Sequence, residues 1–395
     1  MHWWRIWKRL NAITPNPITA QINQATKVNP MPDNQALQTV DTELAPLRVQ
    51  IDALDTQLIT LLNERAKLAQ AVGHVKQKYK QPVFRPEREA QVLEKIAQRN
   101  PGPLPSHHLQ ALWREVMSVC RAMEEAVKVA FLGPAGTYTE QAMAKQFGHA
   151  IHGIDCSTID DIFRTVEADG AAFGVVPIEN SIEGAINRTM DLLLSTPLKI
   201  CGEVSLAINH HLLQITGDMS GVTTIVAHPQ ALAQCHHWLK EHYPHIEQKP
   251  VGSNAQGAQM AQNDPTTAAI ASDIAAATYG LQTVTAGIQD DANNRTRFIV
   301  IGKQLCGTSP NDKTSLILAT PNKAGALYDL LEPLAKHGVS MLRFESRPAK
   351  QKGWEYFFYI DFAGHIEQAN VQAALAQLED NSAFYKCLGS YPVTS

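Results

Sequence analysis

The sequence contains no CxxC pair, no large excess of charge of one sign and no apolar segment of signal-peptide length near its start. Because its six cysteines stand singly, their spacing predicts neither a zinc site nor a disulfide framework and favours a reducing cytoplasm. A net charge of −4 provides no basic field for nucleic acid, so we expect local cationic pockets for small anions instead. The missing apolar segment gives no reason to expect a signal peptide or a membrane partner.

The first forty residues differ in composition from the rest of the chain. Residues 1–10 carry three tryptophans among three basic residues, and a run rich in Pro, Asn, Gln and Thr follows to Val40. One interpretation is an amphipathic segment that touches a membrane or a partner. The other, which we adopt, is a disordered leader over residues 1–40, or a true start at Met31.

After this leader, an apolar heptad pattern predicts one long helix over 41–79, which Gln81-Pro82 ends. Its seam consists of Leu47, Ile51, Leu54, Leu58, Leu61, Leu68, Val72 and Val75. Arg65 occupies a seam position where a hydrophobic residue belongs, and a guanidinium there needs an anion. Lys76 lies about 20° around the helix from Arg65, so both cations point the same way. The pattern therefore predicts an anion site in a helical core.

Arg48 is separated from this pair of cations. It lies about 25 Å along the helix axis from Arg65 and about 100° around it, too far to join the same pocket within one helix. An antiparallel second copy of the helix would bring it to that pocket. We therefore expect a homodimer, or a higher homo-oligomer, that shares its cations.

Three further regions follow along the chain. Pro86 opens a second helix that runs to Gln98, and Ser106 caps a third that runs to about 127. From an apolar strand at 128–132, strands alternate with helices to about 304, which is an α/β pattern. After a linker at 306–310, the order strand, helix, strand, strand, helix, strand predicts a ferredoxin-like fold. These last elements are expected at 314–319, 325–337, 340–347, 355–362, 370–378 and 384–391.

Residues 41–127 resemble the helical chorismate mutases. The motifs that carry this resemblance are Leu-Arg48-x6-Asp55, Glu64-Arg65-x10-Lys76 and Pro86-Glu87-Arg88-Glu89. The resemblance implies the rearrangement of chorismate to prephenate, which needs no nucleophile, metal or cofactor. The protein has to compress and polarise its substrate.

The same resemblance implies a role for each matching residue. Arg48, Arg65 and Arg88 would hold carboxylates or the ring side of chorismate. Lys76 would donate to the ether oxygen, and Glu89 would fix the ring hydroxyl. Where the family usually has a Ser and often a Gln in the third helix, this chain has Cys120 and Glu124. An ionised Glu124 would repel the negative charge that develops on the ether oxygen, so we expect it to act only when protonated.

Residues 128–304 resemble the prephenate dehydratases. The segments that match, in the family's order, are Gly133-Pro134-Ala135-Gly136-Thr137-Tyr138-Thr139, Pro177-Ile178-Glu179-Asn180-Ser181-Ile182-Glu183-Gly184, His228-Pro229-Gln230 and Thr296-Arg297-Phe298. The first is a glycine turn before a helix, which would present backbone N–H groups to an anion. The family has a two-lobed fold like periplasmic binding proteins. We expect one lobe at 128–203 plus 286–303, and the other between them.

Prephenate would bind in the cleft between the lobes and lose CO2 together with its ring hydroxyl, so a donor must meet the departing oxygen. Thr296 is the family's candidate, and Asn180 and Gln230 match further active-site positions. The prephenate site would also include Thr137, Ser181 and Glu183, and Arg297 would meet a carboxylate. His228 is an alternative general acid, although a His before Pro-Gln often bonds only its own backbone.

Residues 311–395 resemble the ACT regulatory domain. The matching motifs are Gly325-Ala326-Leu327 at a helix start and Glu345-Ser346-Arg347-Pro348 at a strand end. In that family they line an interface site for L-phenylalanine, and backbone amides at a helix N-terminus suit its carboxylate. We therefore expect L-phenylalanine to bind there as an allosteric inhibitor.

The three modules occur in the order of a bifunctional mutase and dehydratase family of phenylalanine biosynthesis: all-α, two-lobed α/β, and ferredoxin-like α+β. Two alternatives stay open, a sensor of aromatic acids or amino acids that has lost catalysis, and a dehydratase that uses arogenate. The presence of Thr296, Lys76 and Arg65 argues against the sensor. A fused mutase supplies prephenate locally, which argues against arogenate as the main substrate.

Overall fold

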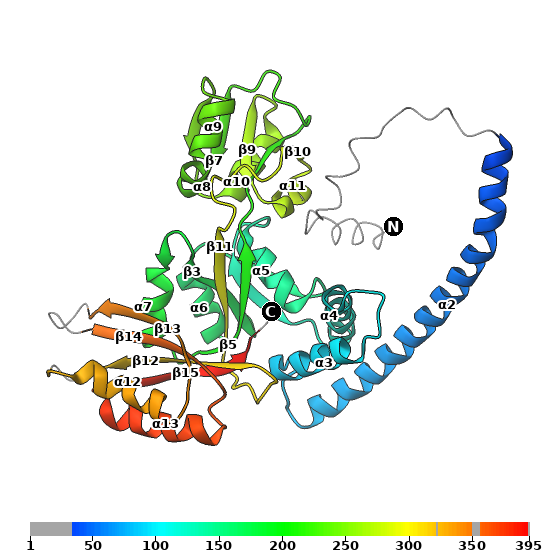
Figure 1. Ribbon diagram of the computed structural model, residues 1–395. Coiled ribbons are helices and arrows are strands. Elements are labelled where there is room, and N and C mark those ends of the chain that lie inside the picture. The colour runs from blue at the N-terminus through cyan, green and yellow to red at the C-terminus, as the bar shows by residue number, and fades with distance from the viewer. Residues whose placement is uncertain (1–33, 321–322, 350–355, 394–395) are drawn as a thin grey trace. The chain divides into compact units, whose positions relative to one another are not determined.

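The computed structural model describes residues 34–320, 323–349 and 356–393, with side chains from residue 40 onward (Figure 1). The expected disordered leader lies outside the described residues as far as residue 33. Its last residues, 34–40, already belong to the first described helix, α2 (Asn34–Lys78). The sequence from 34 to 40 contains neither Gly nor Pro, so nothing in it ends a helix.

The other two helices of the N-terminal region are α3 (Pro86–Arg99) and α4 (Ser106–Ala122). Pro86 stands at the start of α3, as the sequence predicts. Helix α4 differs from expectation at both ends. Its N-cap is Pro105, and the Ser106 hydroxyl instead accepts from Asn100 Nδ2 at 3.1 Å. It ends at Ala122 rather than near 127, because the next N–H groups turn back to the Arg121 carbonyl.

The seam of α2 is exposed along its length in the single chain. The exposed fraction is 54% for Leu47, 57% for Leu54 and 70% for Leu68. A helix of this composition normally buries such a face against another element. The seam therefore marks an apolar surface that a single copy of the described chain leaves uncovered.

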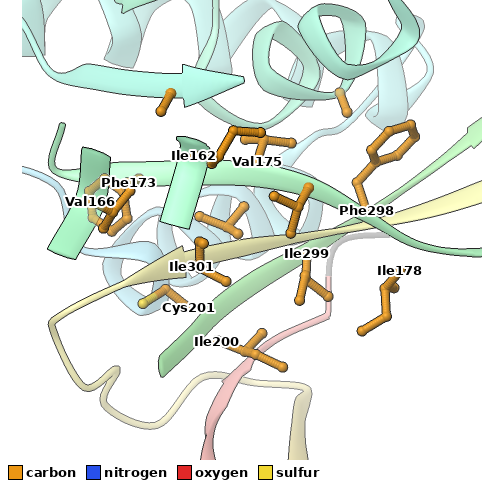
Figure 2. Packing of buried hydrophobic residues seen from close by; sticks show 14 of the residues in the cluster. Ile162, Val166, Phe173, Val175, Ile178, Ile200, Cys201, Phe298, Ile299 and Ile301 are labelled. Carbon is orange, nitrogen blue, oxygen red and sulfur yellow. The ribbon is translucent and has the colours of Figure 1, made fainter. Parts of the chain in front are cut away.

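The first lobe of the central region is built on a six-stranded sheet in the order β2-β1-β3-β11-β5, with β4 paired to β3. Its strands are β1 (Lys128–Leu132), β2 (His152–Cys156), β3 (Phe173–Asn180), β4 (Gly184–Ala185), β5 (Lys199–Ala207) and β11 (Arg295–Gly302), and its helices are α5 (Tyr138–Phe147), α6 (Ile159–Glu167) and α7 (Asn187–Ser195). Ile162, Phe173, Ile299 and Ile301 meet in its core (Figure 2).

The second lobe has a five-stranded sheet in the order β10-β6-β9-β7-β8. Its elements are β6 (His211–Gln214), β7 (Thr224–Ala227), α8 (Pro229–Gln234), α9 (His236–His242), β8 (Glu247–Pro250), α10 (Asn254–Asn263), β9 (Thr267–Ala271), α11 (Asp273–Tyr279) and β10 (Gln282–Thr285). The chain passes from the first lobe to the second after Ala207 rather than near 203. The reason is that β5 pairs with β11 as far as Ala207, which lies opposite Arg295. We call the two connecting segments, 208–210 and 286–294, the hinge.

The C-terminal region has the predicted ferredoxin-like order. Its elements are β12 (Asp312–Ala319), α12 (Ala326–Lys336), β13 (Met341–Pro348), β14 (Tyr356–Ala363), α13 (Ala369–Asn381) and β15 (Phe384–Pro392), and the sheet order is β13-β14-β12-β15. One face of this sheet packs on α12 and α13 (Figure 1). The other contributes Ile317, Tyr359 and Tyr391 to the core of the first lobe. The two regions therefore share a hydrophobic core.

The loop between α2 and α3 is also anchored in the first lobe. Phe84 is buried, with its ring centroid 4.7 Å from that of Phe147 and 5.2 Å from that of Phe173. Gln304 Nε2 donates to the Phe84 carbonyl at 3.2 Å. An aromatic trio of this kind contributes packing and edge contacts together. Among the described helices, none is both long and apolar enough to cross a bilayer.

Candidate active sites

The first candidate site lies where α2 ends. Lys76 Nζ is 3.2 Å from Glu124 Oε2, and it also donates to the Val83 carbonyl at 2.8 Å. Glu124 lies in the turn after α4 rather than on the helix itself. Its side chain packs on Gly73, where an added Cβ would stand only 2.8 Å from Glu124 Cγ. Glycine at 73 therefore permits the approach that pairs Lys76 with Glu124.

Glu89, on the first turn of α3, completes this charged cluster. Its carboxylate pairs with Arg121 of α4, whose guanidinium is buried. Burial raises the pKa of Glu89, although the positive charges of Arg121, Arg114 and Lys76 oppose the shift. The cluster is thus a partly desolvated set of opposite charges.

Arg121 connects this cluster to the first lobe. Besides Glu89, it donates to the Phe147 carbonyl, and its guanidinium carbon lies 4.8 Å from the Phe84 ring centroid. The sequence analysis did not single it out, because Arg is common on helix surfaces and its burial depends on packing between distant segments. Its contact with Glu89 spans 32 residues.

The second candidate site lies at the hinge and contains no charged group in its hydrogen-bond chain. Asn180 Nδ2 donates to Thr296 Oγ1 and to Asn294 Oδ1, both at 2.9 Å. Asn294 Nδ2 in turn donates to Gln234 Oε1 at 2.9 Å, and Nε2 of His210 lies 2.9 Å from the same oxygen. A carbonyl oxygen only accepts, so His210 Nε2 carries the hydrogen. We call these five side chains the amide chain.

The amide chain fixes the direction of the Thr296 hydroxyl. Its oxygen already accepts from Asn180, which leaves the hydroxyl hydrogen to be donated elsewhere. Asn180 is itself held in place, because its Oδ1 accepts from the N–H groups of Ile182 at 2.9 Å and Glu183 at 3.2 Å. Ser181 Oγ accepts from the Arg295 N–H at 2.9 Å. Every polar atom of Asn180 therefore serves to orient its neighbours.

Burial keeps the far end of the amide chain neutral. It lowers the pKa of His210, although the bond to Gln234 opposes the shift. Tyr138 lies beside it, with its hydroxyl 3.2 Å from His210 Nδ1 and 2.6 Å from the Asn209 carbonyl. Burial, with Asp273 contributing, raises the pKa of Tyr138 well above its usual value. In the described residues, no group of three or more His, Cys, Asp or Glu side chains could hold a metal ion.

Comparison with known families gives three matches in the order of the three regions. The chorismate mutase type II model matches residues 47–125, the prephenate dehydratase model 129–305 and the ACT domain model 314–380. The bifunctional chorismate mutase/prephenate dehydratase of Neisseria gonorrhoeae is 48% identical over 90% of this chain and 98% of its own. The chain belongs to this bifunctional family. It combines a chorismate mutase, a prephenate dehydratase and an ACT domain, which fits feedback regulation.

Solved structures resemble the dehydratase and ACT modules. The prephenate dehydratase of Arthrobacter aurescens in complex with L-Phe is 35% identical, with a TM-score of 0.62, and the match covers 67% of this chain and 89% of that one. GqqA, described as a novel type of quorum quenching acylase, is 29% identical with the same TM-score over 68% and 98%. The same fold is therefore described as a prephenate dehydratase in one protein and as an acylase in another. The roles of residues have to be argued from the site rather than from the fold.

Other residues expected in the mutase site lie differently in the single chain. Cys120 is buried, Arg65 is half-buried and Arg88 is exposed. The side chain of Arg48 is 64% exposed and lies 3.6 Å from Asp41. The described contacts therefore bring together Lys76, Glu89 and Glu124, but they include no contact of Arg65 or Arg88 with this cluster.

In the glycine turn of the dehydratase module, the Gly136 N–H is already taken by a carboxylate of the protein. Gly136 N–H donates to Glu140 Oε2 at 2.6 Å, so the anion is supplied by the following helix. Thr137, expected to bind prephenate, uses its hydroxyl as the N-cap of α5 and donates it to the Leu132 carbonyl at 2.8 Å. The turn instead contacts the second lobe, where Ser272 Oγ donates to the Gly136 carbonyl at 3.1 Å.

Arg297 was expected to meet a substrate carboxylate, and in the structure it contacts carboxylates of the protein. Its guanidinium lies 2.7 Å from Asp361, 3.1 Å from Glu203 and 3.3 Å from Glu179. Burial alone would lower the pKa of Arg297, but Asp361, Tyr391 and Glu203 raise it. Adjacent residues of a strand face opposite sides of the sheet, so Arg297 points away from the side that bears the Thr296 hydroxyl.

His228 has the backbone role that the sequence analysis gave as the alternative. Its Nδ1 accepts from the Gln230 N–H at 3.3 Å and caps α8. Gln230 is half-buried one turn before Gln234, and Gln234 is the member of α8 that joins the amide chain. The sequence analysis missed Gln234, Asn294 and His210. Asn294 was within reach, because it lies only two residues before Thr296.

The two ACT motifs lie at the expected places in their elements. Gly325 has φ +79° at the N-cap of α12, a conformation that glycine adopts without strain, and Ala326 and Leu327 begin the helix. Glu345, Ser346, Arg347 and Pro348 end β13. Arg347 is engaged with the dehydratase module, where it donates to the Asn187 carbonyl at 2.6 Å and lies 3.0 Å from Asp191.

Proposed function

We propose that Thr296 donates the hydrogen bond that the departing ring hydroxyl of prephenate requires. The observation that supports this role is the Asn180 bond to Thr296 Oγ1, which leaves the hydroxyl hydrogen available. As the C–C bond to the carboxyl group breaks, its electron pair enters the ring and the C–O bond breaks. The departing oxygen takes up a proton and leaves as water, and CO2 and phenylpyruvate are the other products. Stabilising the leaving oxygen is the task left to the protein.

Asn180 holds Thr296 in this proposal, while Gln230, Ser181 and Glu183 border the substrate in the cleft. Asn294, Gln234 and His210 extend the support into the hinge, so closure of the lobes and orientation of the donor are linked. Arogenate has the same ring hydroxyl and carboxyl group, and only its side chain differs. A comparison of the two substrates therefore tests specificity without altering the proposed role of Thr296.

In the mutase module we propose that Lys76 donates to the ether oxygen of chorismate and that protonated Glu124 gives a second hydrogen bond. The ion pair at 3.2 Å supports the placement of both groups at one point. Chorismate would insert between them and replace the contact of Lys76 with the carboxylate. Glu89 would fix the ring hydroxyl, Arg65 and Arg88 would bind carboxylates beside Cys120, and no cofactor is involved.

A second copy of the chain completes this pocket in our proposal. The exposed seam of α2 supports a homodimer, because burying its leucines and valines against an antiparallel copy removes them from water. The same arrangement brings Arg48 of one copy toward the chorismate pocket of the other. The chain also has six free cysteines and the modules of a biosynthetic enzyme, so we place it in the cytoplasm.

We further propose that L-phenylalanine, bound to the Arthrobacter relative, binds the ACT module of this chain near Gly325, Ala326, Leu327 and the β13 end at Glu345 and Ser346. The N-terminus of α12 offers backbone N–H groups for the carboxylate of the amino acid. The ligand would inhibit dehydration from a distance. Reciprocal linkage then requires that prephenate weaken the binding of L-phenylalanine.

One experiment tests the whole assignment. Pure protein is incubated with chorismate, and the loss of chorismate and the appearance of prephenate and phenylpyruvate are followed together. We expect all three signals, and L-phenylalanine should suppress only the last. Binding of aromatic acids without turnover would support the sensor alternative, and faster conversion of arogenate than of prephenate would reverse the substrate assignment.

A further inference from the structure

The Thr296–Asn180 pair has a charged counterpart on the opposite face of the same two strands. In the register of β11 and β3, Thr296 is opposite Asn180 and Arg297 is opposite Glu179. Side chains alternate along a strand, so the neutral pair faces the hinge and the charged pair faces the other way. The Arg297 guanidinium lies 3.3 Å from Glu179 Oε2. The two cross-strand pairs are one residue apart.

Besides Glu203 of β5, which lies 3.1 Å from Arg297, the ACT module supplies two partners of the charged pair. Asp361 of β14 lies 2.7 Å from Arg297, and Arg343 of β13 lies 2.9 Å from Glu179 Oε2. The side chain of Arg297 is 17% exposed and that of Asp361 is 9% exposed. Because water has little access to Arg297 and Asp361, this pair interacts strongly and holds a defined geometry, whereas Glu179 is 36% exposed. We call Arg297, Glu179, Arg343 and Asp361 the ion-pair clamp.

The strand segment that the clamp grips pairs with β5 on one side and with β3 on the other, and its ladder with β3 ends at an irregularity. The register between β11 and β3 shifts between Arg297 and Phe298, where Phe298 is opposite Pro177 and Ile178 is left over. Such a bulge bends β3, the strand that carries the extra residue, and re-aims the side chains beside it. Phe298 itself is buried in the core of the first lobe (Figure 2). Residues 295–297 thus form a short arm between that core and the hinge, with Thr296 at its centre.

Strand β13 connects the clamp to the ACT motif. Arg343, Glu345 and Arg347 alternate along β13 and share one face, with Arg343 3.6 Å from Glu345. Arg343 contacts Glu179, while Arg347 contacts Asp191 of α7 at 3.0 Å. A ligand that draws Glu345 away from Arg343 therefore changes the charge balance at Glu179. Ion pairs through Glu179 connect β13 directly to the arm that carries Thr296.

We propose that Arg297 is a positioning residue through which the ACT module sets the place of Thr296. This rests on the proposed function of Thr296 and deepens it by naming the physical link to the allosteric site. With the clamp formed, the arm holds the Thr296 hydroxyl where Asn180 can orient it. When the ligand shifts β13, the clamp moves the arm and the donor loses its alignment, while the substrate pocket keeps its contacts with prephenate.

The test measures dehydratase kcat and KM, inhibition by L-phenylalanine and mutase rate on the full-length chain. We expect Arg297→Met to lower kcat tenfold or more with little change in KM for prephenate, and to lose most of the inhibition while calorimetry still shows L-phenylalanine binding. Arg297→Lys should recover much of the kcat. Arg343→Met should weaken the maximal inhibition. Lys303→Met removes an exposed pair with Asp169 at 2.7 Å and should change none of these quantities.

Each contrary result has a distinct meaning. A raised KM with unchanged kcat in Arg297→Met would make Arg297 a substrate ligand and overturn the positioning role. Full inhibition by L-phenylalanine in both Arg297→Met and Arg343→Met would overturn the coupling. If Arg297→Met fails to fold, as judged by thermal unfolding and mutase rate, Arg297→Lys and Arg343→Met decide instead. A wild-type chain that does not dehydrate prephenate would refute the proposed function itself, whereas a working wild type with unaffected variants refutes only the clamp.

Discussion

The mutase and dehydratase sites of this chain use opposite electrostatic means. The mutase cluster consists of ionisable groups, Lys76, Glu89 and Glu124, and burial raises the pKa of Glu89. The dehydratase site is a run of amides and a hydroxyl that ends at a histidine kept neutral by burial. Negative charge that develops on an ether oxygen calls for a cation. A departing hydroxyl calls for one hydrogen bond of fixed direction, which neutral neighbours provide without competing charges.

The largest expected effect separates the two sites completely. Thr296→Ala removes the donor while leaving the mutase cluster untouched, so dehydration should fall by about 10²- to 10⁴-fold and prephenate should accumulate from chorismate. The measurement is phenylpyruvate formation beside chorismate loss on the same sample. Thr296→Ser keeps the hydroxyl and serves as the matched control. Near wild-type phenylpyruvate formation by Thr296→Ala would remove Thr296 from the mechanism.

The second effect tests whether the mutase site belongs to one chain or two. Lys76→Ala and Arg48→Ala should each lower mutase turnover by about 10²- to 10³-fold, since each removes a charged contact to the substrate. Mixing the two variants under subunit exchange should restore activity in one pocket of each mixed dimer. The dehydratase rate of every sample should stay constant. Absence of recovery in dimers shown to have exchanged would exclude a shared site.

The third effect tests whether the two sites are structurally independent of each other. Phe84 belongs to the mutase loop but is 2% exposed in the dehydratase core, so Phe84→Ala should cost about 3–5 kcal/mol in the free energy of unfolding. Mutase turnover should also fall, because the adjacent Val83 carbonyl that holds Lys76 loses its anchor. Thermal unfolding and both rates are measured. Leu104→Ala, at a loop residue 54% exposed, is the control, and equal stability of the two variants would refute the anchor.

The fourth effect concerns the carboxyl group in the mutase site. As Glu124 loses its proton it faces the ether oxygen with a negative charge, so wild-type mutase turnover should fall toward alkaline pH. Glu124→Gln keeps a donor at every pH and should hold its turnover there. The dehydratase pH profile, set in another module, should be the same in both proteins. Identical mutase profiles would show that Glu124 does not contact the reacting oxygen.

The smallest effect concerns the pH dependence of stability at the hinge. Burial lowers the folded-state pKa of His210, so the unfolded state binds its proton more readily. The stability that this group contributes is present above the unfolded-state pKa of about 6.5 and is lost as pH falls through the lowered folded-state pKa. His210→Gln should therefore lessen the fall in free energy of unfolding between pH 7.5 and 5.5, measured by urea denaturation. His245→Gln, on an exposed histidine, should leave that fall unchanged.

The two sites also differed in how far the sequence could predict them. Arg65 interrupts an apolar heptad, and a charge in a seam is a local contradiction that periodicity exposes. Asn294 and Gln234 contradict no pattern, because amides are ordinary in loops and at helix ends. Their roles depend on contacts between residues 114 and 60 positions apart in the sequence. No rule based on local sequence predicts contacts at such separations.

Arg297 shows a different limit. Its place next to Thr296 suggested a shared site, yet the alternation of a strand already implied opposite faces. The ferredoxin-like order followed from strand and helix patterns, and the two lobes were implied by the family resemblance. The residue at which the chain leaves the first lobe, Ala207, depended on how far β5 pairs with β11. The extension of α2 to Asn34 escaped prediction because the seam of large apolar residues begins later than the helix does.

The Phe84 anchor has a consequence for the order of synthesis. Phe84 leaves the ribosome well before Phe147 and Phe173, and Gln304, which bonds its carbonyl, follows 220 residues later. The mutase sequence is therefore complete long before the strands that receive its loop exist. A nascent chain that stops short of β3 carries all three mutase helices together with an unburied aromatic ring. The module made first reaches its final arrangement only after the module made later has folded.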